Sequence, residues 1–148
     1  MTFSSTQRGM SRAAAYGPGS SFWLYKELTS SAITQTAADL TGVSDGRLYI
    51  KQIIVQTDET GLGGGTNLVI QSNNANGLAT ILSQAISGLG ANKTVTLLDA
   101  GTTKVPTILE SGKKLQVKST AADCTGSGKV RIFVECVRLD EKATVEVA

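Results

Sequence analysis

The chain has 148 residues, of which 41% are hydrophobic and 18% charged, a composition typical of one globular domain with its own core. Its formal net charge of +2 is too small to indicate a nucleic-acid or membrane partner through bulk electrostatics. Histidine is absent, which removes His-based acid–base catalysis and the commonest zinc ligand. We therefore expect a protein that is not an enzyme and that holds no cofactor and no metal.

We expect residues 1–21 to form an extended arm and residues 22–148 to form the folded domain. The arm is rich in Ser, Gly, Arg and Ala, and it shows neither a strand or helix period nor the apolar run of a signal peptide. Arg8 and Arg12 make the arm basic, and together with Tyr16 they are the residues expected to bind a partner. The arm either folds back on its own domain or is held by a neighbouring subunit.

From Phe22 onward, short β-prone runs alternate with turn-forming residues. The expected strands cover residues 22–28, 31–37, 47–57, 66–71, 78–82, 94–98, 114–119 and 129–139. Short strands at this spacing indicate a sandwich or a barrel. A helix over 79–87 is an alternative for one run, because its apolar residues also fit one helical stripe.

The two longest runs, 47–57 and 129–139, are the expected central strands. Strict alternation over the first run puts apolar residues on both faces: Leu48, Ile50 and Ile54 on one, and Tyr49, Ile53 and Val55 on the other. This pattern predicts a strand that is covered on both sides for part of its length.

The two cysteines do not form a disulfide framework. Cys136 falls on the apolar face of run 129–139, which favours a buried free thiol. Cys124 lies in a glycine-rich loop, and the sequence is compatible with a bridge between the two as well as with two free thiols.

Three further features have a structural and a functional interpretation. Phe22, Trp23 and Tyr25 form an aromatic cluster, for which core packing is favoured over an exposed ligand platform. The glycine-rich stretch 61–66 fails as a phosphate loop, because no Lys-Ser/Thr pair follows and the next run is a strand. The acidic pair at 58–59 is expected to be a solvated loop tip, with calcium binding as the alternative.

Two stretches resemble parts of a known kind of jelly roll. Residues 48–74 (LYIKQIIVQTDETGLGGGTNLVIQSNN) are similar to the early strands of tumour-necrosis-factor-like and complement-C1q-like jelly rolls. Residues 107–141 (TILESGKKLQVKSTAADCTGSGKVRIFVECVRLDE) are similar to the closing part of the same fold. The resemblance covers Arg47 to Glu141, about two-thirds of the chain, and the arrangement is shared with head-decoration (cement) and fibre proteins of tailed bacteriophages.

The resemblance implies an all-β chain with a single jelly-roll-like β-sandwich and an extended N-terminal arm. The function implied is that of a virion structural protein, which decorates and stabilises a capsid by oligomeric surface contacts and uses the arm as a tether. The expected partners are the chain itself, as a homotrimer, and the major capsid protein or another virion protein. Its expected location is the capsid surface, after assembly in the host cytoplasm. The alternative is a receptor- or carbohydrate-binding module of a phage tail or fibre, with Trp23 as its aromatic platform.

Overall fold

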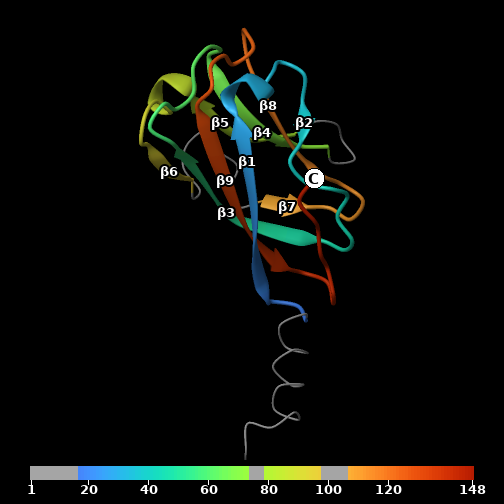
Figure 1. The fold of residues 1–148 in the computed structure, drawn as a ribbon. Coiled ribbons are helices and arrows are strands. Elements are labelled where there is room, and N and C mark those ends of the chain that lie inside the picture. Colours follow the sequence, from blue (N-terminus) through green and yellow to red (C-terminus); the bar gives the residue numbers. More distant parts are fainter. Residues whose placement is uncertain (1–16, 74–78, 98–106) are drawn as a thin grey trace, which may run out of the picture.

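The chain folds into two antiparallel β-sheets packed face to face (Figure 1). The computed structural model describes residues 17–73, 79–97 and 107–148. Its strands are β1 (Ser21–Thr29), β2 (Ala38–Asp39), β3 (Leu48–Thr57), β4 (Asn67–Ser72), β5 (Ala79–Ala85), β6 (Thr94–Leu97), β7 (Thr107–Leu109), β8 (Leu115–Ser119) and β9 (Lys129–Arg138). Two 3₁₀ turns, η1 (Ser30–Ala32) and η2 (Ile86–Gly88), follow β1 and β5.

The strand order is that of a jelly roll. One sheet runs β1-β9-β3-β6, with β7 also paired to β3, and the other runs β2-β8-β4-β5. The chain crosses repeatedly between the sheets, so that strands far apart in sequence become neighbours, as two interleaved Greek keys require. The expected all-β sandwich is confirmed, and so is the central position of β3 and β9. No helix in the described ranges is long and apolar enough to cross a membrane.

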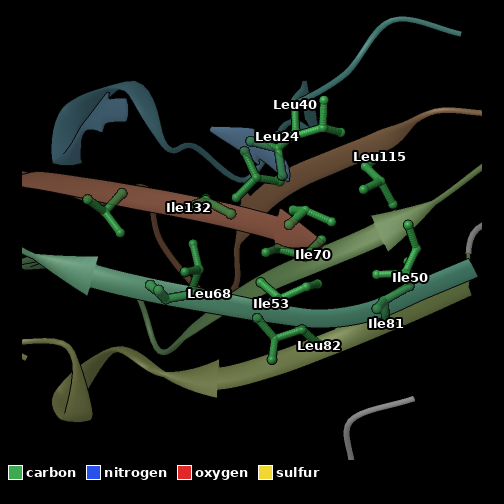
Figure 2. Packing of buried hydrophobic residues seen from close by; sticks show 14 of the residues in the cluster. Leu24, Leu40, Ile50, Ile53, Leu68, Ile70, Ile81, Leu82, Leu115 and Ile132 are labelled. Atoms are coloured by element: carbon green, nitrogen blue, oxygen red, sulfur yellow. The ribbon is translucent and has the colours of Figure 1, made fainter. Parts of the chain in front are cut away.

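The core lies between the two sheets and is built from aliphatic side chains (Figure 2). In β9 the inward residues alternate strictly with outward ones, and the buried apolar residues are Val130, Ile132, Val134 and Cys136. Ile53 of β3 packs toward Leu68 and Leu82 of the opposite sheet, and all three side chains are fully buried. Each such side chain contributes about 1.5–3 kcal/mol through burial.

A β-bulge in β3 changes which side chains of that strand face the core. Ile50 pairs with Cys136 and Gln52 pairs with Glu135, so Lys51 is an extra residue on the β3 side. The extra residue shifts the alternation by one position. Leu48, Ile50, Ile53 and Val55 therefore all face the core, while Tyr49 and Ile54 face outward. The prediction that grouped Ile54 with Leu48 and Ile50 is wrong, because strict alternation cannot anticipate a bulge.

Two other expectations differ in their outcome. The strand expected over 78–82 is confirmed as β5, so the alternative helix over 79–87 is wrong, and a bulge opposite Ile70 and Gln71 lets adjacent Ile81 and Leu82 both be buried. The run 31–37 is not a strand: its start belongs to η1, and pairing resumes only in the two-residue β2. Ser30 explains the turn, since its hydroxyl donates to the carbonyl of Thr125 and its side chain is fully buried.

The segment after β9 runs back along the segment between β2 and β3. Thr144 pairs with Asp45 and Val147 pairs with Thr41 as isolated bridges. The Ala148 N–H donates to the carbonyl of Leu40 at 3.1 Å, and the Lys26 ammonium donates to the Ala148 carbonyl. This tail therefore joins the β2 side of the sandwich to β1.

Candidate interaction surface

The outer side of the β1-β9-β3 sheet carries aromatic and aliphatic side chains. Strand alternation turns Leu24 inward and leaves Trp23 and Tyr25 outward, 48% and 46% exposed. We call this surface the aromatic face; its residues are Trp23, Tyr25, Tyr49, Ile54, Phe133 and Val137. Aromatic and aliphatic side chains exposed together on one face are typical of an interaction site.

The centre of the aromatic face is a cross-strand row. Tyr25 lies opposite Phe133, and Phe133 lies opposite Ile54, so the row spans β1, β9 and β3. The rings of Tyr25 and Phe133 are 5.1 Å apart between centroids and inclined at 43°. Such a tilted pair stabilises the sheet by about 0.5–1.5 kcal/mol beyond area burial. The row is therefore both a structural tie and a preformed apolar surface.

A second row places Trp23 beside polar groups. Trp23 lies opposite Glu135, which pairs in turn with Gln52. The Gln52 amide donates to the Glu135 carboxylate at 2.8 Å, and the Lys51 ammonium lies 3.9 Å from the same carboxylate. Glu135 thus has both a hydrogen-bond donor and a cation beside it, which lowers the cost of covering it with a partner.

One end of the aromatic face is a compact ion cluster. Glu27 accepts from Arg131 at 3.0 Å, and the Lys129 ammonium lies 3.6 Å away. The Tyr25 hydroxyl donates to the same carboxylate at 3.4 Å. The hydrogen bond from Arg131, followed by the charge of Lys129, lowers the pKa of Glu27. The cluster keeps Glu27 ionised and fixes the tip of Tyr25.

The structure separates the three aromatic residues that the sequence grouped together. Phe22 is partly buried against the core, with the Arg138 guanidinium carbon 4.3 Å from its ring centroid. The favoured core packing is wrong for Trp23 and Tyr25. The missed signal is the alternation of β1 itself, in which Trp23 and Tyr25 share parity with charged Glu27, whereas Phe22 shares it with Leu24.

The three residues expected to bind a partner, Arg8, Arg12 and Tyr16, lie outside the described residues. A turn over residues 17–19 leads into β1. The Gly19 N–H donates to the Arg138 carbonyl at 2.7 Å, and the Arg138 N–H donates to the Ser20 carbonyl at 2.8 Å. Residues 17–20 are thus tied to the end of β9, and Ser21 is the first residue of β1.

The two cysteines are free and buried, as expected for Cys136. Burial raises the pKa of the Cys136 thiol to about 12 and also raises that of Cys124. Both thiols are therefore protonated and poorly nucleophilic at neutral pH.

The glycine-rich loop and the acidic pair have structural roles. The loop 61–66 leads into strand β4, which agrees with the rejection of a phosphate loop. The Asp58 carboxylate accepts from the N–H groups of Thr60 and Gly61, at 2.9 and 2.8 Å, and the bond from Gly61 is the main reason why the pKa of Asp58 is lowered. Over the described ranges no three His, Cys, Asp or Glu side chains gather as a metal site would require.

A small recess lies under β1, between Leu24, Lys26 and the tail residue Val147. Its volume of about 10 Å³ is the space of about one water molecule. It is too small for a ligand, so the aromatic face is the stronger candidate.

Comparison with known proteins gives distant likenesses, and only to solved structures. No family model and no curated protein matches the chain. A chain in the structure of infectious bursal disease virus, Gx strain, is similar at 14% identity with a TM-score of 0.22, over 88% of this chain and 36% of that chain. This chain thus spans about a third of the length of the viral chain, and a likeness this low carries no argument about function.

Proposed function

We propose that this protein is a structural component of a virion, which decorates and stabilises a capsid through surface contacts between folded domains. The observation that carries the proposal is the aromatic face. It offers a preformed apolar surface on a two-layer sandwich, with its neighbouring carboxylates already paired to cations or donors. A surface of this kind suits contact with another protein surface.

Area and repetition make such contacts effective. Trp23 and Tyr25, 48% and 46% exposed, together present roughly 200 Å² of side chain. A standard interface buries about 800 Å² on each partner, so the two rings form the centre of a contact and not its whole. On a capsid lattice, modest contacts gain strength because many are made at once.

The proposed partners are the chain itself, as a homotrimer, and the major capsid protein or another virion protein. Residues 1–16, which contain Arg8, Arg12 and Tyr16, are the proposed tether, and they precede residues 17–20, which are bonded to the end of β9. The proposed location is the capsid surface, and the role includes no chemical step.

Sedimentation of lysates from cells that express the gene tests this function, with an antibody against the folded domain as the probe. We expect the protein in fast-sedimenting particles, and we expect electron microscopy of those fractions to place it on a capsid surface. Detection only in the slowly sedimenting fraction, at every stage of expression, would overturn the proposal.

Removal of residues 1–16 tests the tether separately. The truncated chain keeps Gly17–Ser20 and their bonds to Arg138, so it should unfold at the same temperature as the full chain. We expect it to bind isolated particles at least tenfold more weakly. Equal binding of the two forms would refute the tether and leave the surface role standing.

The exposure of Trp23 beside Tyr25 also supports a second function, a receptor- or carbohydrate-binding module of a tail or fibre. Aromatic rings on an open face can stack on sugar rings. A glycan array together with quenching of Trp23 fluorescence separates the two functions. Saturable glycan binding that is lost in Trp23→Ala favours the second, and the absence of any glycan signal leaves the capsid role.

A further inference from the structure

Strand β1 is the outer strand of its sheet and leaves one long side open. It is nine residues long and pairs with β9 along its whole length. Among the described residues, the backbone of Phe22–Leu28 forms hydrogen bonds with β9 alone. An open strand of this length is a template for another strand, because its outward N–H and C=O groups are already aligned.

We propose that β1 pairs with β1 of a second copy, antiparallel and around a two-fold axis at Leu24. The inference needs no virion and goes beyond the proposed function: the two-fold contact is separate from the contacts of the proposed homotrimer and joins copies in pairs. The two-fold axis stands perpendicular to the sheet, so the aromatic faces of the two copies lie on the same side and become continuous. Self-complementarity of this kind is what an isologous interface requires.

The sequence of β1 selects this register. With the axis at Leu24, Trp23 lies opposite Tyr25 of the second copy, and the pair occurs twice. Directly opposed aromatic residues are favourable cross-strand pairs. The overlap runs from Ser21 to Glu27, about 23 Å of strand.

Two neighbouring registers oppose a charged residue either to a like charge or to an apolar side chain. An axis at Lys26 sets Lys26 against Lys26 of the second copy, and like charges opposed in this way are destabilising. An axis at Tyr25 sets Trp23 against Glu27 and Leu24 against Lys26 of the second copy. The register at Leu24 opposes no like charges and leaves Glu27 in its cluster with Arg131 and Lys129.

Disulfide trapping tests directly whether residue 23 of one copy lies opposite residue 25 of the other. Trp23→Cys and Tyr25→Cys variants with tags of different size are mixed and mildly oxidised. The mixture should give a cross-linked heterodimer, because opposed Cα atoms in an antiparallel pair lie about 4.5–5.5 Å apart, within the range of a disulfide. That heterodimer also keeps one intact aromatic pair. The native cysteines are buried and should contribute nothing.

The matched control is Val43→Cys, a residue that is 63% exposed and lies outside β1. We expect the heterodimer band to exceed the band from the control at least tenfold, and either β1 variant oxidised alone to give little dimer. A dimer from Tyr25→Cys alone would put the axis at Tyr25 and overturn the register. A heterodimer no stronger than the control would overturn the pairing itself.

Sedimentation equilibrium gives an independent measurement without cysteine chemistry. Trp23→Thr removes both aromatic pairs but keeps a good strand former, so it should fold and should weaken self-association about tenfold. Val43→Thr should leave the association unchanged. Self-association that is the same in both variants, or a full-length chain that stays monomeric at every concentration, would overturn the inference.

Discussion

Gly128→Ala should be strongly destabilising although it adds a single methyl group. A Cβ at Gly128 would lie 1.8 Å from the Gly61 carbonyl oxygen and 2.9 Å from the Gly61 nitrogen. The Gly61 backbone cannot move away from an added methyl group, because its N–H is bonded to the Asp58 carboxylate and its Cα faces the Gly90 carbonyl. Overpacking costs about 1–3 kcal/mol, and a clash between two backbones belongs at the upper end, about 3 kcal/mol. For a domain of this size that cost lowers Tm by roughly 10 °C.

Thermal and urea unfolding measure this cost, and Gly90→Ala is the control. A Cβ at Gly90 meets no atom within 4 Å, and Gly90 does not have a positive φ. Its substitution should therefore change the free energy of unfolding by no more than about 0.5 kcal/mol. If Gly128→Ala is as stable as Gly90→Ala, the close approach of the two loops does not exist as described.

Three further predictions concern the core, pH and the thiols. Ile53→Ala should cost about 3 kcal/mol in urea unfolding and Ile54→Ala less than half as much, because the bulge buries Ile53 and turns Ile54 outward; the reverse order would refute the bulge. The Arg47 guanidinium, which lies 2.8 Å from the Asp140 carboxylate, lowers the pKa of Asp140 to about 2. The stabilising contribution of this pair is therefore complete above about pH 4 and is lost as the pH falls toward 2. Asp140→Asn should reduce the change of the urea unfolding midpoint with pH between pH 4 and pH 2. A change with pH equal to that of the natural sequence would contradict a stabilising ion pair. Ellman's reagent should leave both cysteines unmodified in the folded protein at pH 8 and modify both after unfolding, because Cys136 is buried with a pKa of about 12; rapid labelling of the folded form would show that the thiols are accessible.

The strands that the sequence predicted well are those with strict alternation over a long run. Residues 129–139 appear as β9 and residues 114–119 appear as β8, with alternate residues of each strand facing the core. Period-two burial leaves a direct trace in the sequence, so these strands needed no tertiary information.

The elements that the sequence missed depend on contacts between distant residues. The bulge at Lys51 is set by the pairing of β3 with β9, more than 70 residues later, and no local pattern encodes it. The run 31–37 has a good strand composition, but the buried Ser30 hydroxyl is bonded to Thr125 and the chain turns there instead. The aromatic face was missed for a different reason. Large aromatic rings are usually mostly buried, and the prediction followed this tendency although the alternation of β1 put Trp23 and Tyr25 on the outer face.

The place of β9 between β1 and β3 has a consequence for synthesis and folding. Leu28 of β1 and Thr57 of β3 both pair with Val130 of β9. Neither β1 nor β3 can form its pairing with β9 before β9 has been synthesised. At 5–20 residues per second, β1 remains without its partner for roughly 5–20 s after it leaves the ribosome. Pairing across about 100 residues also belongs to the slow class of folding reactions, on the scale of milliseconds to seconds. A nascent chain therefore carries β1 unpaired, and β3 paired only with β6 and β7, until β9 has been made, and that interval is when aggregation competes with folding.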